Sequence, residues 1–331
     1  MEGIDFSNVK LTKKTYGGAN GQKFQINYNG ELYMLKFPSK AKQNENLSYA
    51  NGCISEYLGS HIFNLIGIPA QETLLGTYNK NGKEKIVVAC KDFISEPGIV
   101  IQDFISIKNT VVDSEGMGAG TELSEVLYAI DNQGQYDPKK LKEFFWDMFI
   151  VDAMIGNWDR HNGNWGLLYD ERSDKVVGIS PIFDCGSTLF PQADEEMMEK
   201  VLENRADRDY RIYEVPTSAL KTDGHKINYY NYISSLENKD CNAALRRIVP
   251  RIDLEAINNM IDETPYIGDL QKQFYKTMIS ARKEILLDRP LKKLLKKEKK
   301  EPSLSHSLAN GPDPEQHKKK PSNNGTADGR L

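Results

Sequence analysis

The sequence predicts an α+β fold in two lobes, a small β-rich N-terminal lobe with one helix and a larger, mostly helical C-terminal lobe. Two hairpin patterns lie within the first hundred residues, whereas apolar residues recur at helical spacing beyond residue 120. With 331 residues, the chain is long enough for two lobes that share a cleft. We expect the N-terminal lobe to span 1–95, the C-terminal lobe 96–290 and a basic, disordered tail 291–331.

Both hairpins of the expected N-terminal lobe centre on an Asn-Gly dipeptide. In the first, polar and apolar residues alternate through 23–37 around Asn29-Gly30, and in the second, 73–89 surrounds Asn81-Gly82. Asn and Gly tolerate the positive φ angles that two-residue hairpin turns require. The two segments therefore predict the strands of one small sheet.

One helix is expected between the two hairpins, and several follow in the second lobe. Ile54, Leu58 and Ile62 share one face of the first helix, and Gly67-Ile68-Pro69 ends it. Two further helices are indicated by shared apolar faces, and helical patterns resume later in the chain. The two faces comprise Leu123, Val126, Leu127 and Ile130, and Leu141, Phe144, Phe145 and Met148, and the later patterns cover 194–204, 228–248, 253–262 and 268–288.

The most informative segment reads Gly-Asn-Trp-Asp-Arg-His-Asn-Gly-Asn over residues 156–164. It offers the carboxylate of Asp159 and the amide oxygen of Asn164 at the spacing Asp-x-x-x-x-Asn. A hairpin predicted over 166–179 would fold the chain back and bring Asp184 beside Asn164. Phosphoryl transfer uses this layout to hold a substrate hydroxyl and Mg²⁺ together, with oxygen ligands that Mg²⁺ prefers. We expect Asp159 to accept a proton and Asn164 and Asp184 to bind the metal, although each residue alone is typical of a turn.

Lys36 is the expected phosphate contact, because its ammonium group ends an otherwise apolar strand. A lysine that extends from an edge strand into solvent is the alternative for this position. Glu56 is expected to pair with Lys36, since it lies on the helix face opposite the apolar stripe. Glu45 is the competing partner for the same ammonium group.

Two further segments are expected at a nucleotide. Gly17, Gly18, Ala19, Asn20 and Gly21 precede the first hairpin strand, where glycines allow backbone N–H groups to approach phosphates. The segment does not match the Walker A pattern. Lys91, Asp92 and Phe93 follow the second hairpin, where a connection between lobes would offer backbone groups to adenine; an ordinary loop is the alternative.

His161 is expected at the nucleotide site, where it would brace the loop by hydrogen bonding. The other histidines are scattered along the chain, so a zinc site is not indicated. Trp158 and Trp165 flank the loop and are expected to pack beneath it.

Composition excludes several other classes of protein. The formal net charge is −4 and the pI about 5.9, so binding to nucleic acid is not expected. The four cysteines lie far apart and are expected to be free thiols. We find no apolar run of the length of a signal peptide or a membrane span, so synthesis in the cytoplasm is expected.

From Lys292 the composition changes to a lysine-rich run, and a second cluster occurs at 318–320. Beyond about residue 300, the tail has too little apolar surface to offset the entropy of ordering, and we expect it to be disordered. A solvated end is the simplest interpretation of the tail. Nuclear import or contact with an anionic surface is the alternative.

On 156–164 and 182–186, the sequence resembles the HipA-like branch of the protein-kinase-like fold, which includes bacterial serine/threonine kinases. Lys36, Glu56 and the glycine-rich loop follow that family's order, so the resemblance covers roughly residues 10 to 290. Within the branch, the chain is similar to a compact, secreted, proinflammatory type. The resemblance implies a bilobal kinase-like fold, ATP with Mg²⁺, and phosphorylation of Ser or Thr in a protein substrate, including autophosphorylation.

The resemblance assigns the role of base to Asp159, of metal ligands to Asn164 and Asp184, and of phosphate contact to Lys36. It also implies secretion and action on a host protein. HipA toxins carry an additional N-terminal subdomain that engages a DNA-binding antitoxin, and this chain starts too near its glycine-rich loop to contain one. An antitoxin partner is therefore not expected. The phosphate loop of HipA carries a regulatory serine, whereas the loop at 17–23 contains none, so the resemblance does not imply self-inactivation by phosphorylation there.

Two alternatives to a protein kinase remain at the level of sequence. Phosphoinositide kinases also use Asp-Arg-His-x-x-Asn, so the acceptor hydroxyl can belong to a lipid or a small metabolite. The second alternative is a nucleotide-binding signalling scaffold that does no chemistry. All the polar groups that turnover needs are present, which favours an enzyme.

Overall fold

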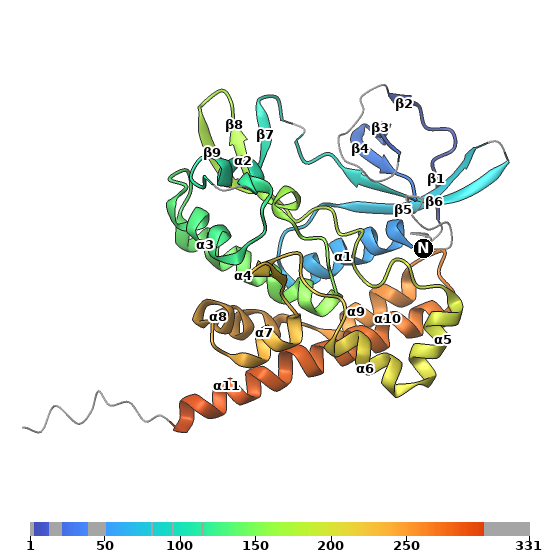
Figure 1. Cartoon of the computed structure of the whole chain (residues 1–331). Helices are drawn as coiled ribbons and strands as arrows, with labels where there is room; N and C mark the ends of the chain where they lie inside the picture. The colour runs from blue at the N-terminus through green and yellow to red at the C-terminus, as the bar shows by residue number, and fades with distance from the viewer. Residues whose placement is uncertain are drawn as a thin grey trace, which may run out of the picture. The chain divides into compact units, whose positions relative to one another are not determined.

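The computed structural model describes residues 3–12, 22–38, 51–80, 82–94, 96–113 and 116–300. The glycine-rich segment at 17–21, Glu45 and the tail at 301–331 lie outside the described residues. Met1–Leu294 forms one compact unit and Leu295–Leu331 a second one. The first unit combines a β-rich part with a mostly helical part (Figure 1), which confirms the predicted α+β class.

A six-stranded sheet dominates the first ninety residues, with the strand order β1-β5-β6-β4-β3-β2. Both predicted hairpins are confirmed, because β3 pairs with β4 and β5 with β6 in antiparallel register. Asn29 and Gly30 both have positive φ, at 51° and 87°, as a tight two-residue turn requires. The strands are β1 (Ile4–Asp5), β2 (Leu11–Thr12), β3 (Lys23–Tyr28), β4 (Glu31–Lys36), β5 (Thr73–Lys80) and β6 (Lys83–Lys91).

Helix α1 (Gly52–Ile66) lies along this sheet (Figure 1), and Ile54, Leu58 and Ile62 are fully or almost fully buried. Gly67 ends the helix in the left-handed conformation with φ of 79°, as the sequence predicts. Buried side chains from α1 and β6 belong to the same core cluster as those of the helical part. The helix therefore connects the sheet to the rest of the unit.

Helix α4 (Pro138–Ile155) forms the centre of the helical part, and its last two turns are entirely buried. Asp137 caps its N-terminus, and Gly156 ends it with φ of 67° at the start of the loop with Asp159. The other helices are α2 (Phe104–Asn109), α3 (Leu123–Asn132), α5 (Glu195–Glu203), α6 (Arg205–Tyr213), α7 (Tyr229–Ser235), α8 (Lys239–Ile248), α9 (Leu254–Glu263), α10 (Asp269–Arg282) and α11 (Arg289–Lys300).

A three-stranded antiparallel sheet follows the order β7-β8-β9, with β7 (Ile99–Asp103), β8 (Gly166–Asp170) and β9 (Lys175–Ile179). The β8–β9 hairpin was predicted, whereas β7 was not. A Cβ atom at Gly166 would lie 2.2 Å from the carbonyl oxygen of Gln102, so only glycine permits this approach of β8 to β7. A further short hairpin pairs β10 (Lys221–Thr222) with β11 (His225–Lys226).

The helical patterns differ from the expectations in three places. The pattern over 228–248 contains two helices, because Leu236 adopts a left-handed conformation after α7 and Asn238 caps α8. Short helices α2 and α6 were not predicted. The segment 291–300, which the sequence assigns to the tail, is helical as part of α11, following a π-helical turn at Lys283–Asp288.

All four cysteines are free, as predicted, and all four are buried. None of the described helices combines the length and the apolar character that crossing a bilayer requires.

Candidate active site

A cleft of about 710 Å³ is lined by residues from the six-stranded sheet, α1, the loop after α4 and the segment after β9. Eight of the residues predicted for the site line it, namely Lys36, Glu56, Asp92, Phe93, Asp159, His161, Asn164 and Asp184. These residues are separated by up to 148 positions along the chain, and the fold brings them together in one cleft. The glycine-rich segment lies outside the described residues.

Lys36 stands between two carboxylates. Its Nζ atom lies 3.0 Å from Oε2 of Glu56 and 3.1 Å from Oδ1 of Asp184. Burial alone would lower the pKa of Lys36, but the charges of Asp184 and Glu56 raise that pKa well above its ordinary value. The ammonium group is therefore fully charged at neutral pH and is held in a fixed direction.

Glu56 is almost fully buried, with 2% of its side chain exposed, and also accepts a hydrogen bond of 3.1 Å from the backbone N–H of Cys185. Helix α1 packs closely on this segment: a Cβ atom at Gly59 would lie 2.7 Å from Cβ of Cys185. Thr188 adds a hydrogen bond of 3.2 Å to the carbonyl of Ser55. Glu56 thus connects the lysine of the sheet with the chain that follows Asp184.

Asp184 is 41% exposed at the cleft. The ammonium group of Lys36 is the main reason that the pKa of Asp184 falls to about 2, and Lys23 acts in the same direction, so the carboxylate is ionised at neutral pH. Its backbone has φ of 57°, a strained conformation for a residue with a side chain.

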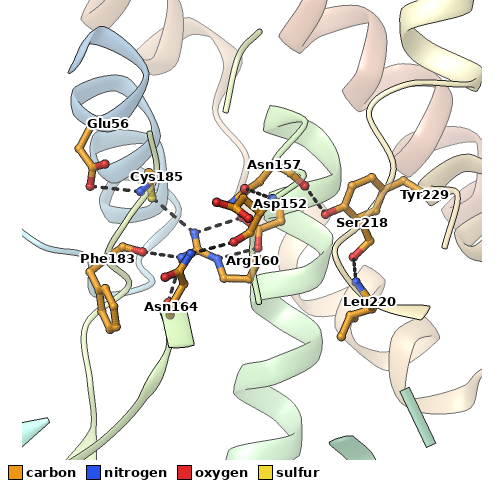
Figure 2. A network of polar contacts seen from close by, with 11 residues as sticks. Glu56, Asp152, Asn157, Arg160, Asn164, Phe183, Cys185, Ser218, Leu220 and Tyr229 are labelled. Atoms are coloured by element: carbon orange, nitrogen blue, oxygen red, sulfur yellow. Dashed lines mark hydrogen bonds and ion pairs between the residues drawn. The ribbon is translucent and has the colours of Figure 1, made fainter. Parts of the chain in front are cut away.

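Arg160 connects the loop between α4 and β8 to its surroundings through several buried polar contacts (Figure 2). Its guanidinium group forms a buried ion pair of 3.0 Å with Asp152 on the last turn of α4. The same group donates hydrogen bonds to the carbonyl oxygens of Asn164, at 3.1 Å, and of Phe183. One side chain therefore fixes both ends of the loop and the residue before Asp184.

Asn157 provides the second support of the loop (Figure 2). Its side chain donates to Asp152 at 2.9 Å and accepts from the backbone N–H of Asp159 at 3.0 Å. The hydroxyl of Tyr229 on α7 donates to the Asn157 carbonyl at 2.6 Å. Sequence reasoning did not assign Asp152, Asn157 or Tyr229, because their partners lie in other elements and no local spacing marks them.

Asp159 is partly exposed at the cleft, and its pKa is raised, mainly by burial and further by the negative charge of Asp184, while His161 opposes the shift. The side-chain amide of Asn164 donates a hydrogen bond of 2.8 Å to the Asp159 carbonyl. This bond uses the amide nitrogen, so the amide oxygen of Asn164 is the atom suited to bind a cation. Asn164 and ionised Asp184 together offer the hard oxygen donors that Mg²⁺ prefers.

His161 lines the cleft, and its Nδ1 accepts a hydrogen bond of 3.0 Å from the backbone N–H of Gly163. Trp165 is buried and stacks on Phe104 with ring centroids 4.0 Å apart, so it packs beneath the loop as expected. Trp158 is only half-buried. No group of three His, Cys, Asp or Glu residues suited to a metal occurs in the part of the chain that the structure describes.

Of the predicted site residues that the structure describes, Lys91 is the one that does not line the cleft. Its ammonium group pairs with Glu31 at 2.9 Å and with Glu72 at 3.2 Å. Its backbone N–H donates to the carbonyl of Glu72, and the backbone N–H of Asp92 donates to Leu32, both at 2.8 Å. These two N–H groups are therefore already used within the protein.

Comparison with known proteins identifies the family. The family described as HipA-like C-terminal domain matches residues 14–256. The chain belongs to this HipA-like family. It is also 51% identical over 290 residues to the serine/threonine-protein kinase CtkA of Helicobacter pylori strain J99, covering 87% of each chain.

Solved structures support the same relationship. The crystal structure of the proinflammatory kinase CtkA of Helicobacter pylori matches with a TM-score of 0.83 and 50% identity. The match covers 89% of the present chain and 98% of the CtkA chain. HipA of Shewanella oneidensis MR-1, solved with HipB and operator DNA, matches with a TM-score of 0.52 and 16% identity. This second match covers 85% of the present chain and 68% of HipA, and it shows a common fold only.

Proposed function

We propose that the protein is an ATP-dependent serine/threonine protein kinase that uses Mg²⁺ and phosphorylates itself as well as a protein substrate. The contact of Lys36 with both Glu56 and Asp184, in the cleft that also contains Asp159 and Asn164, carries this proposal. The 51% identity to a protein named as a serine/threonine kinase supports the choice of acceptor.

In this proposal Lys36 contacts the phosphates of ATP, and its charge offsets theirs. Glu56 keeps the ammonium group directed into the cleft, because Glu56 is itself fixed by the Cys185 N–H. Asn164 and Asp184 hold Mg²⁺, which neutralises phosphate charge when bound. His161 braces the loop at the nucleotide through its bond to Gly163.

Asp159 accepts the proton of the attacking Ser or Thr hydroxyl. Its carboxylate lies at the cleft and its raised pKa makes it a stronger base than an ordinary aspartate. Arg160 and Asn157 fix the backbone on both sides of Asp159, so the carboxylate is held in place before the substrate arrives.

The choice of a protein substrate rests on the relatives rather than on the cleft, and secretion and action on a host protein rest on the resemblance of the sequence. CtkA is described as proinflammatory, and we extend action on a host protein to this chain on that likeness. The lobe boundaries 1–95 and 96–290 belong to the same proposal. An antitoxin partner is not part of it, because the match to HipA is a likeness of fold.

The proposal is tested by incubating the protein with Mg·ATP and locating phosphate by mass spectrometry. Phosphoserine or phosphothreonine on the protein or on a generic protein acceptor is expected, and Asp159→Asn is expected to reduce it strongly while nucleotide binding persists. Parallel reactions with lipid and sugar acceptors identify a small-molecule kinase if only those are labelled. Binding of ATP without transfer to any acceptor contradicts the proposal and indicates a scaffold.

A further inference from the structure

Gln71 follows α1, and its carboxamide has a hydrogen-bond partner at the nitrogen but none at the oxygen among the described residues. Its side chain is buried, with 6% of the residue exposed, and lines the cleft. Its Nε2 donates a hydrogen bond of 2.8 Å to the carbonyl of Lys91, and its backbone N–H donates to Ile182, also at 2.8 Å. Oε1 is buried and has no hydrogen-bond partner among the described residues. Buried acceptors are almost always paired, so this atom needs an explanation.

The surroundings of Gln71 fit a flat, largely apolar ring. Met34 from β4, Val88 from β6 and Ile101 from β7 line the same cleft, together with Phe93 and Phe183. The rings of Phe93 and Phe183 lie 6.0 Å apart. Phe93 belongs to the connection after β6, so this apolar part of the cleft lies beside that connection.

Polar groups of that connection are already partly used. The N–H groups of Lys91 and Asp92 donate to Glu72 and Leu32, and the Lys91 carbonyl accepts from Gln71. No described residue accepts a hydrogen bond from the Phe93 N–H. The N–H of Phe93 and Oε1 of Gln71 are therefore the donor and the acceptor with which a base can form hydrogen bonds.

We propose that Gln71 selects the base of the nucleotide: its Oε1 accepts a hydrogen bond from the 6-amino group of adenine and disfavours purines with a 6-oxo group. This inference rests on the proposed function, since it concerns the base of the nucleotide used there. It assigns a specificity-determining residue that lies outside the Asp159 loop and outside the connection itself.

The chemistry of the two purine classes explains the selection. Adenine presents N–H donors at position 6 and an acceptor at N1, which match Oε1 of Gln71 and the N–H of Phe93. Guanine and hypoxanthine present an acceptor at position 6 and a donor at N1, the opposite pattern. Rotating the carboxamide to suit them would turn Oε1 toward the Lys91 carbonyl and break the existing 2.8 Å bond.

The test compares Mg·ATP with Mg·ITP, because inosine differs from adenosine at position 6 and N1 and lacks the 2-amino group of guanosine. We expect the wild-type protein to prefer ATP by about tenfold or more in kcat/KM and in nucleotide affinity. Gln71→Met removes both polar atoms at similar volume and is expected to reduce this preference by about tenfold.

Gln133→Met is the matched control. Gln133 is also 6% exposed, but its Nε2 donates to Tyr136 and its Oε1 accepts from Gln135 and Tyr136, and it does not line the cleft. Gln133→Met removes a buried glutamine and is expected to leave the preference for ATP over ITP unchanged. Thermal unfolding of each variant separates loss of selectivity from loss of folded protein.

Two outcomes overturn the inference: equal use and binding of ATP and ITP by the wild-type protein, or an unchanged preference in Gln71→Met. If the wild-type protein transfers phosphate from neither nucleotide, the proposed function fails instead. The affinities of the two nucleotides then still measure base selection by Gln71 independently of transfer.

Discussion

The ammonium group of Lys36 lies 3.0 Å from the carboxylate of Glu56, and 20 residues along the chain separate the two. The pair joins β4 of the sheet to α1, and Asp184 approaches the same ammonium group from the helical part. One charge therefore orders three segments around the cleft. This arrangement, together with the contacts that support the Asp159 loop, leads to five predictions.

Glu56→Gln is expected to lower turnover by about 10- to 100-fold, because a charge-assisted hydrogen bond contributes about 1.5–3 kcal/mol. Lys36 loses one partner and turns toward Asp184. Steady-state measurement of kcat and KM for ATP checks this. Glu72→Gln, which removes a partner of Lys91 outside the cleft, is the control and is expected to leave kcat unchanged. An equal effect of both variants would contradict a specific role of Glu56.

Asp184→Asn is expected to remove the Mg²⁺-dependent part of nucleotide binding. Titration with ATP in Mg²⁺ and in EDTA measures this directly. If the variant and the wild-type protein bind ATP with the same affinity in Mg²⁺, Asp184 is not a metal ligand.

The same carboxylate predicts a pH dependence of stability. Because the pKa of Asp184 is lowered from 3.8 to about 2 in the folded protein, its contribution is complete above pH 3.8. That contribution is lost as the pH falls toward 2. Urea unfolding midpoints measured between pH 5 and 2 should fall less steeply in Asp184→Asn than in the wild-type protein.

Asp159→Asn is expected to reduce transfer by about 10²- to 10⁴-fold, the usual contribution of a general base. The pKa of Asp159 is raised above 3.8, so activity is expected to decline on acidification at a higher pH than an ordinary aspartate would give. A profile of kcat against pH measures this limb. An acid limb that persists unchanged in the residual activity of Asp159→Asn would assign the titration to another group.

Asp152→Asn is expected to destabilise the fold by about 3–5 kcal/mol, because it leaves the buried guanidinium of Arg160 without its counter-charge. The side chains of Asp152 and Arg160 are only 1% and 5% exposed. Asp147→Asn on the same helix breaks the more exposed pair with Arg247 and is expected to cost about 1 kcal/mol or less. Chemical unfolding of both variants compares the two pairs, and equal losses would contradict the role given to burial.

The sequence predicts the parts of this molecule that depend on local patterns. Asn29-Gly30 predicts a hairpin because the turn needs positive φ there, and Gly67 ends α1 for the same reason. The spacing from Asp159 to Asn164 is set by one short loop, so the sequence alone is enough to bring them together. Their chemical roles stay predictions.

Features that depend on distant partners were not predictable. Nothing in the local sequence distinguishes Asp152 from other helical aspartates, because its partner Arg160 reaches it only in the folded chain. The role of Gln71 likewise depends on its hydrogen bond to the Lys91 carbonyl, 20 positions away. Strand β7 pairs with β8, which lies beyond α4 in the chain, so no local hairpin pattern marks it. The break between α7 and α8 falls at Leu236, whose left-handed conformation no residue preference indicates.

The close packing of α1 on the chain after Asp184 has a consequence for movement. Glu56 binds the Cys185 N–H, Thr188 binds the Ser55 carbonyl, and Gly59 leaves no room for a side chain between the two segments. An outward movement of α1 would break both hydrogen bonds and separate Gly59 from Cys185 at the same time. Helix α1 and the chain after Asp184 are therefore expected to shift as one body in any rearrangement of the cleft.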